Sequence, residues 1–160
     1  MFKKLSLILL ATAISSYTYA DIIELDALNP DHCRQQILNS TDEFPVIAAY
    51  TSNSLDGNSK SFMKKFELLA KNHPEKTFFK WDAKKDLGHA TQALCLQQLG
   101  FVVPPNILLF GVIKDEKIGT MMTAPLRLQW AGQMSTEDMN SFIDVSDSQM
   151  RTSMLSHKNR

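Results

Sequence analysis

Strand-like and helix-like patterns alternate along this sequence, and the alternation limits its fold more than any other feature. The strand-like runs lie at residues 45–50, 77–81 and 106–110. The first run is continuously apolar, which is typical of a strand covered on both faces. Between the first two runs, Phe62, Phe66 and Leu69 recur at helical spacing within residues 59–72. This order predicts an α/β domain with helices on both faces of a central sheet.

Weaker signals complete the predicted order β-α-β-α-β-α-β-β-α. They indicate a strand at 22–25, a helix from Asn29, a helix at 87–99 ended by Gly100, a strand at 126–130 and a helix from Ser135. Asn29 suits the N-cap of its helix, and Pro30 suits the first helical position. Because no helix separates the last two strands, we expect the sheet to be mixed.

A long connection, residues 111–131, separates the strand at 106–110 from Gly132 and contains the strand predicted at 126–130. Residues 114–117 predict a polar turn within it. Met121 and Met122 are interpreted as core residues, with an adaptable contact surface as the alternative.

The first twenty residues have the three parts of a secretory signal peptide. Lys3 and Lys4 precede an apolar run from Leu5 to about Ile14, and small residues end the segment at Ala20. The apolar run is shorter than the ~20 residues that a membrane-spanning helix needs. We therefore expect cleavage after Ala20, a periplasmic or secreted protein, and no stable membrane insertion afterwards.

Three segments follow from these patterns. Residues 1–20 are the signal peptide and residues 21–144 form one domain. From Val145 to Arg160 the periodicity fades, so residues 145–160 are expected to form a polar, flexible tail.

Charge and motif content exclude several functions. The chain has 17 basic and 17 acidic residues, and removal of the two leader lysines leaves 15 against 17. Proteins that bind nucleic acid carry a basic face, so we expect no nucleic-acid partner. The sequence has no Gly-rich phosphate loop, nucleophile elbow or zinc-type ligand spacing, so it predicts no cofactor and no metal.

Three segments resemble the thioredoxin family, in the same order and at similar spacing. Residues 100–110, GFVVPPNILLF, are similar to the thioredoxin stretch GIRGIPTLLLF, which places Pro105 on the family's cis-proline. Residues 132–135, GQMS, resemble the Gly-x-Leu-Ser entry to the family's last helix, and residues 45–70 resemble its redox-site unit of strand, loop and helix. The resemblance covers residues 22–144 and implies a thioredoxin-like three-layer α/β/α sandwich with a central mixed sheet.

The resemblance also implies that the redox cysteines are missing. A thioredoxin-type enzyme carries two cysteines at the first turn of the long helix, whose N-terminus lowers the thiol pKa. Here that stretch is Asp56-Gly57-Asn58-Ser59, with Asp56 and Ser59 in place of the sulfurs. A serine hydroxyl cannot form a disulfide. Asp56 is interpreted as a turn or capping residue, with a catalytic carboxylate as the alternative, and no catalytic residue is predicted.

The proline loop departs from the family pattern as well. In the family, the residue before the cis-proline pairs its backbone with the substrate peptide. That residue is Pro104 here, which has no N–H to donate. By resemblance, we expect this loop, residues 53–59 and the approach to Gly132 to converge at one end of the sheet.

The two cysteines, Cys33 and Cys95, lie 62 positions apart. The thioredoxin fold packs their two helices on the same face of the sheet, so the resemblance is compatible with a disulfide between them. Two unpaired thiols and a redox-active pair are the alternatives.

An intact scaffold without its dithiol predicts a protein-binding, chaperone-like or assembly factor rather than an enzyme. Its partner is expected to be another exported or envelope protein. The alternatives are a thiol-disulfide oxidoreductase that uses Cys33 and Cys95, and a structural component of an envelope or secretion assembly. No pattern in the sequence indicates the partner's identity or the oligomeric state.

Overall fold

The computed structural model describes residues 20–26, 29–52, 57–82, 105–115, 119–123 and 126–158. The strands are β1 (Ile22–Glu24), β2 (Val46–Tyr50), β3 (Phe78–Asp82), β4 (Asn106–Leu109), β5 (Val112–Asp115), β6 (Gly119–Met122) and β7 (Leu126–Leu128). The helices are α1 (Pro30–Leu38), α2 (Gly57–Asn72), the short 3-10 helix η1 (Ala131–Gln133) and α5 (Thr136–Lys158). Residues 1–19 of the predicted signal peptide, Cys95 and the helix predicted at 87–99 lie outside the described residues.

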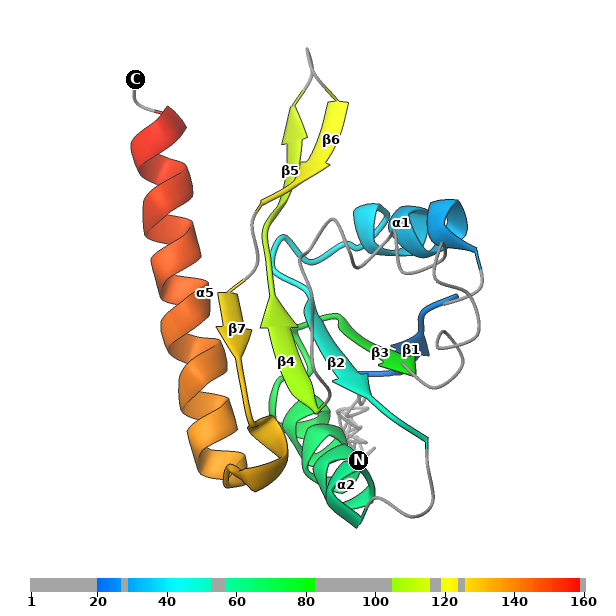
Figure 1. Cartoon of the computed structure of the whole chain (residues 1–160). Helices are drawn as coiled ribbons and strands as arrows, with labels where there is room; N and C mark the ends of the chain where they lie inside the picture. Colours follow the sequence, from blue (N-terminus) through cyan, green and yellow to red (C-terminus); the bar gives the residue numbers. More distant parts are fainter. Residues whose placement is uncertain are drawn as a thin grey trace, which may run out of the picture.

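The main sheet has five strands in the order β1-β3-β2-β4-β7 (Figure 1). Strand β3 pairs parallel with β1 and β2, whereas β4 pairs antiparallel with β2 and β7. The prediction of a central mixed sheet is therefore confirmed. The crossovers β1–α1–β2 and β2–α2–β3 run in opposite directions across the sheet, and their right-handedness places α1 and α2 on opposite faces.

The core lies on both sides of the central strands, as the apolar runs predict. Four consecutive residues of β2, from Val46 to Ala49, are fully buried. On one face, the apolar stripe of α2 packs through Phe66, whose ring meets that of Phe78 edge-on at 5.4 Å between centroids. On the other face, Cys33 and Ile37 of α1 are buried.

Both predicted helix starts are confirmed by their caps. The side-chain oxygen of Asn29 accepts a hydrogen bond from the backbone N–H of His32 at 3.0 Å. At α5, the backbone N–H of Asp138 donates to the Ser135 hydroxyl at 3.0 Å, and that hydroxyl donates to the Asp138 carboxylate at 2.6 Å. This reciprocal arrangement fixes where the last helix begins.

The connection between β4 and β7 contains a hairpin, β5–β6, where the sequence predicted only a polar turn. Val112 pairs with Met122, and Asp115 pairs with Gly119. The base of the hairpin is held by the backbone N–H of Gly111, which donates to the Thr123 hydroxyl at 2.8 Å. Met122 is half-buried against the core, so its interpretation as a packing residue is confirmed.

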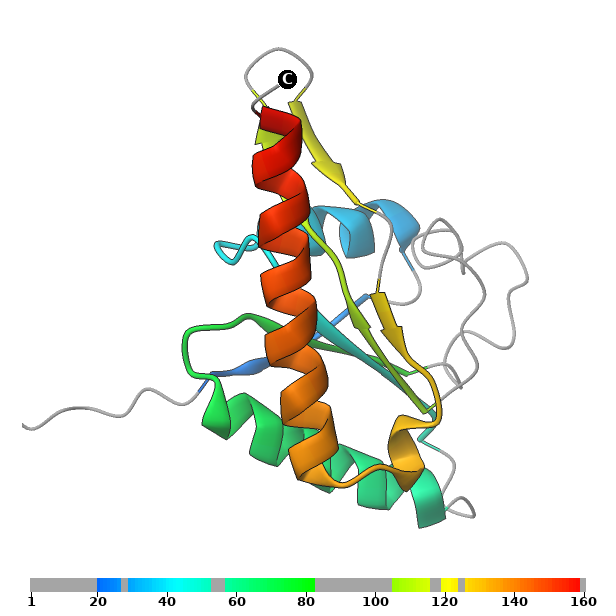
Figure 2. The same ribbon diagram turned by 90° about the vertical axis from the view of Figure 1, so that its left-hand side faces the viewer.

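The prediction of a flexible tail from Val145 is wrong for residues 145–158, which continue α5 as a helix (Figures 1 and 2). The apolar stripe of the helix continues through Ile143 and Met150, but the buried residue between them is Ser146. That serine interrupts the hydrophobic pattern without interrupting the helix.

A group of ion pairs also holds this half of α5 against the domain. The ammonium of Lys76 contacts the Asp147 carboxylate at 2.7 Å, and Arg151 donates to the same carboxylate at 2.8 Å. Arg151 further lies 3.6 Å from Glu43 and stacks over the Phe44 ring at 4.7 Å from its centroid. Because the Lys76 side chain is only 7% exposed, its pair with Asp147 is largely removed from water.

Candidate functional site

One end of the sheet gathers the segments that the resemblance singled out. Strands β2 and β3 end side by side there, with Tyr50 opposite Asp82, and β4 begins there, with Asn106 opposite Ala49. The Asp82 carboxylate accepts a hydrogen bond from the backbone N–H of Ser52 at 3.0 Å. The buried side chain of Asp82 thus fixes the direction of the chain as it leaves β2.

The first turn of α2 carries hydroxyl and amide groups at this end. Asn58 is exposed, whereas Ser59 is 2% exposed and its hydroxyl lies 3.2 Å from that of Thr51. The turn contains no acidic residue and no cysteine. Ser59 therefore links the helix to the end of β2, and the first turn of α2 offers no thiol for exchange. Asp56 lies outside the described residues.

Pro105 and Gly132 meet beside this turn. A Cβ atom placed on Gly132 would lie 2.6 Å from Cγ of Pro105, so no side chain larger than hydrogen fits. Lys65 of α2 secures the same segment, because its ammonium donates to the carbonyls of Gly132 at 3.3 Å and Met134 at 2.7 Å. The predicted approach of Pro105 to Gly132 is confirmed, and Lys65, further along α2 than the predicted residues 53–59, holds the same segment. Pro104 and residues 53–56 lie outside the described residues.

Trp130 lies two residues before Gly132, and sequence reasoning missed its conformation. The sequence placed it at the end of a half-covered strand, but β7 ends at Leu128. Trp130 instead has φ 62° and ψ 24°, in the left-handed region, and is 67% exposed. A bulky residue in this conformation is a genuine outlier, of the kind that clusters at functional sites.

A polar side chain lies beneath this end of the sheet. Asn106 is buried beside Pro105, and within the part of the chain that the structure describes its Oδ1 accepts no hydrogen bond. An unpaired buried acceptor costs stability, so Asn106 is not explained by packing alone.

The other candidate residues do not join this surface. Cys33 is 1% exposed on α1, and its predicted partner Cys95 lies outside the described residues, so the disulfide stays a prediction. His32 contacts Asp26 at 2.9 Å, and His73 contacts Asn140 at 3.1 Å. Within the described ranges, no three His, Cys, Asp or Glu residues are grouped as metal ligands.

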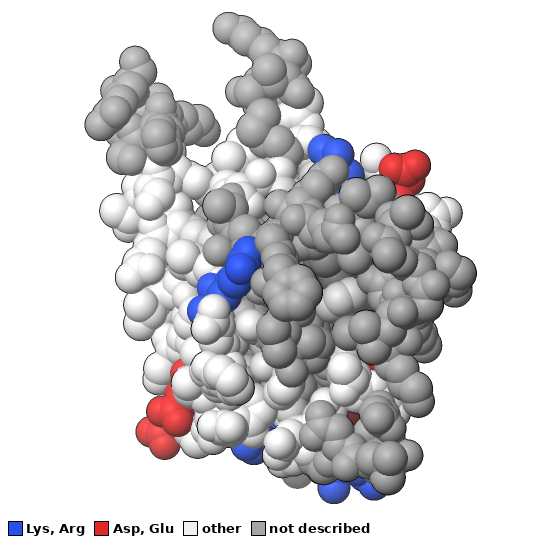
Figure 3. All heavy atoms as spheres, viewed as in Figure 1, with Lys and Arg blue, Asp and Glu red and all other residues white. Residues whose placement is uncertain are grey.

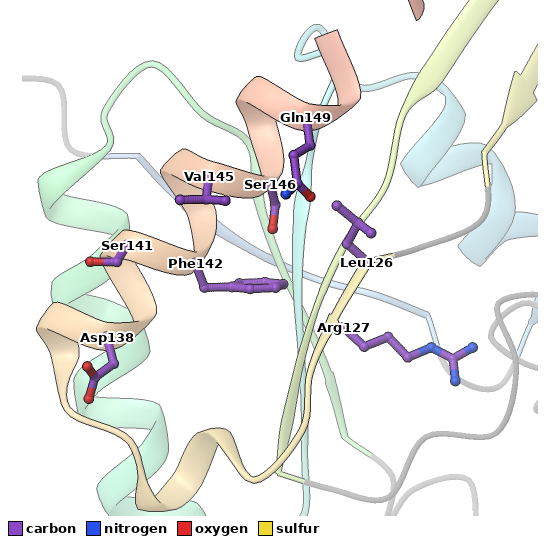
Figure 4. Close-up of a pocket in the computed structure, with 8 residues that line it drawn as sticks. All are labelled: Leu126, Arg127, Asp138, Ser141, Phe142, Val145, Ser146 and Gln149. Atoms are coloured by element: carbon purple, nitrogen blue, oxygen red, sulfur yellow. The ribbon is translucent and has the colours of Figure 1, made fainter. Parts of the chain in front are cut away.

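A second surface is a groove of about 460 Å³ between β7 and α5 (Figure 4). Phe142 points into it from α5 toward the strands, and Leu126 faces Gln149 across it, whereas Arg127 points away. Exposed Val145 also lines the groove. Charged side chains are sparse on the described part of this face (Figure 3). The lining combines apolar, hydroxyl and amide side chains with the charged residues Arg127 and Asp138, and it has no recognisable catalytic set.

No helix in the part of the chain that the structure describes is both long enough and apolar enough to cross a membrane.

Comparison with known proteins identifies the fold. No protein-family model matches the chain, and no curated protein matches it significantly. Among solved structures, spinach chloroplast thioredoxin f is similar, with a TM-score of 0.55 and 16% identity over 81% of this chain and 88% of that one. A chain in the complex of ferredoxin:thioredoxin reductase with thioredoxin f2 is similar, with a TM-score of 0.53 and 21% identity over 79% of this chain and 94% of that one. The Trx4 domain of ERdj5 is similar as well, with a TM-score of 0.52 and 17% identity over 79% of this chain and 96% of that one.

Proposed function

Because the chain has a thioredoxin-like fold, we propose that it binds a segment of another protein at the sheet end where thioredoxins carry their dithiol. We further propose that it does so without thiol chemistry. The protein would then be a chaperone-like or assembly factor that holds its partner rather than oxidising or reducing it. The surface consists of the first turn of α2, Pro105, Trp130 and Gly132.

The observation that carries this proposal is the burial of the Ser59 hydroxyl at a position where thioredoxins have a cysteine. Its hydroxyl is buried and lies 3.2 Å from the Thr51 hydroxyl, so the residue has a structural role in the first turn of α2. A hydroxyl cannot exchange with a disulfide, because exchange needs an attacking thiolate. The loops around this turn are nevertheless tightly held, as the Pro105–Gly132 contact and the two hydrogen bonds from Lys65 indicate.

The burial of Cys33 argues against the oxidoreductase alternative. A thiol that attacks a substrate disulfide must be accessible as well as ionised. Cys33 is 1% exposed on α1, and this helix lies away from the first turn of α2 (Figure 1). It would reach a substrate only if α1 moved away from the sheet.

We propose an exported location for this activity, on the strength of the leader-like first twenty residues. Its partner would then be a periplasmic or envelope protein. Amino-terminal sequencing of the protein recovered from a periplasmic extract tests this, since cleavage after Ala20 gives a chain that begins at Asp21. A chain that retains Met1 in the cytoplasm would exclude it.

Two measurements on purified protein test the function. The protein should give no insulin reduction above the uncatalysed rate, and Cys33→Ser should leave that result unchanged. It should also suppress the aggregation of a reduced, unfolded protein at stoichiometric ratio, because holding a chain needs no turnover. Catalytic reduction that disappears in Cys33→Ser would contradict the proposal, as would a complete lack of binding to unfolded protein.

A further inference from the structure

Trp130 combines two features that are each unfavourable for the isolated chain. Its indole ring is 67% exposed, so it contributes little to the core. Its backbone is in the left-handed region, where glycine or asparagine is the ordinary choice. The N–H of Gln133 donates a hydrogen bond to the Trp130 carbonyl at 2.9 Å and closes a turn over residues 131 and 132, and this bond involves only backbone atoms. The turn does not need a tryptophan.

The segment around the ring is held rigidly. Two residues further along the chain, Gly132 packs against Pro105, and the ammonium of Lys65 binds the carbonyls of Gly132 and Met134. A ring presented from a fixed backbone loses little freedom when it binds, which is the advantage of preorganisation. Tryptophan is also enriched among the few residues that supply most of the energy at protein interfaces.

The chemistry around the ring limits what it can bind. Residues 128–134, LQWAGQM, contain no charged side chain. The glutamines on either side, Gln129 and Gln133, are both exposed. An exposed apolar ring with two exposed amide side chains close to it in the sequence suits a partner that offers an apolar side chain together with main-chain N–H and C=O groups.

We propose that Trp130 is the specificity-determining residue of this surface and that it takes an aromatic or aliphatic side chain from an extended segment of the partner. The ring covers that side chain, and Gln129 and Gln133 hydrogen-bond the partner's main chain on either side of it. This inference rests on the proposed function, because it names the chemical class of partner that the same surface binds.

The test uses two probes and the indole N–H signals of the two tryptophans. The probes are Gly/Ser decapeptides that differ only at a central residue, Phe in one and Ser in the other, together with reduced, carboxymethylated α-lactalbumin as an unfolded chain. The Phe peptide should shift the Trp130 signal and leave that of Trp81, which is buried, in place. The Ser peptide should shift neither signal.

Variants separate binding from folding. Trp130→Gly keeps the turn and removes the ring, and we expect it to weaken binding of carboxymethylated α-lactalbumin by about tenfold or more. Trp130→Phe should recover most of the affinity. Leu155→Ala is the matched control, because Leu155 is a similarly exposed apolar residue (63%) near the far end of α5, and it should bind as the unchanged protein does (Figure 1).

The failures are distinguishable. If the unchanged protein binds the unfolded chain and Trp130→Gly binds it equally well, the role of Trp130 is wrong and the proposed function stands. If the unchanged protein binds neither probe, the proposed function fails and this inference fails with it. A Trp130 signal that moves with protein concentration alone, or with lipid vesicles but neither probe, would assign the ring to a second copy or to a membrane and overturn the inference.

Discussion

Gly132 and Pro105 are in contact so close that a Cβ atom on Gly132 would lie 2.6 Å from Cγ of the proline ring. They come from different parts of the chain, since Pro105 immediately precedes β4 and Gly132 belongs to η1. The ring atom cannot rotate away, because it is tied to the backbone. The contact therefore fixes the distance between the two segments on which the proposed binding surface depends.

Gly132→Ala should destabilise the protein by about 1–3 kcal/mol, the usual cost of forcing an extra carbon into a packed site. It should also weaken binding at the Trp130 surface, because η1 must move to relieve the clash. The free energy of unfolding in urea measures the first effect. Gly119→Ala is the control: Gly119 has φ 83° and nothing within 4 Å of the added carbon, so only conformational strain of about 1 kcal/mol applies. Equal costs for the two variants would show that packing on Pro105 is unimportant.

Lys65→Met should lower the free energy of unfolding by about 1–2 kcal/mol, since two carbonyls lose a charged donor while the methionine keeps the aliphatic packing. The loss should be accompanied by faster amide exchange in residues 131–134, because this segment loses both of its hydrogen bonds from Lys65. Lys64→Met, at an exposed neighbouring position of α2, is the matched control and should change neither quantity. A similar loss in both variants would mean that Lys65 acts only through helix propensity.

The order of the main-sheet elements could be predicted because local patterns determine them. The apolar run of β2, the stripe of α2 and the caps at Asn29 and Ser135 are each contained within a few consecutive residues. The second half of α5 could not be predicted in this way. Its stripe includes a buried serine, Ser146, and its ion pair joins residues 71 positions apart, Lys76 and Asp147.

The candidate site was predicted only in part. The resemblance located Pro105 and Gly132, and the absence of cysteines in the α2 turn is evident from the residues themselves. Trp130 was missed because tryptophan is common in strands, so its place after Leu128 predicts a continued strand. Its left-handed backbone is a conformation that tryptophan rarely adopts. The hairpin β5–β6 was missed because its strands, VIKD and GTMM, show neither a continuous apolar run nor a strict alternation of apolar and polar residues.

The pair between Lys76 and Asp147 should respond unequally to loss of either partner. Asp147→Ala leaves the largely buried ammonium of Lys76 without its carboxylate, and we expect a loss of about 2–3 kcal/mol in the free energy of unfolding. Lys76→Met should cost about 1 kcal/mol or less, because Asp147 keeps Arg151 as a partner and retains some contact with water. Denaturant unfolding of both single variants and the double variant gives the interaction energy. Equal losses of unfolding free energy in Asp147→Ala and Lys76→Met would contradict the claim that burial of the Lys76 ammonium sets the cost.

Acid should weaken the attachment of α5. Burial acts to raise the pKa of Asp147, but hydrogen bonds and charges from Arg151 and Lys76 outweigh it, so the pKa lies below its ordinary value of 3.8. The unfolded chain then binds this proton more readily than the folded chain does. The stabilisation is present above about pH 4 and is lost as the pH falls through the folded-state pKa. Asp147→Asn should therefore show a shallower fall in stability between about pH 5 and pH 3, measured by urea unfolding at each pH. Hydrogen bonds from Ser135 also lower the pKa of Asp138. The Asp147→Asn variant should therefore keep part of the dependence of stability on pH.

Trp130→Gly should not lower the stability of the protein and should raise the free energy of unfolding by up to about 1 kcal/mol. Removing the side chain relieves the left-handed backbone, whose cost for a residue with a Cβ atom is about 1–2 kcal/mol. Part of this gain is offset because glycine also makes the unfolded chain more flexible. Thermal and urea unfolding measure the change, and Trp130→Ala, which keeps the Cβ atom without the ring, is the control that should remain strained. A clear loss of stability in Trp130→Gly would mean that the ring supports the fold. A gain in stability together with a loss of binding would mean that the chain keeps a strained residue for its partner, as expected where stability is given up for function.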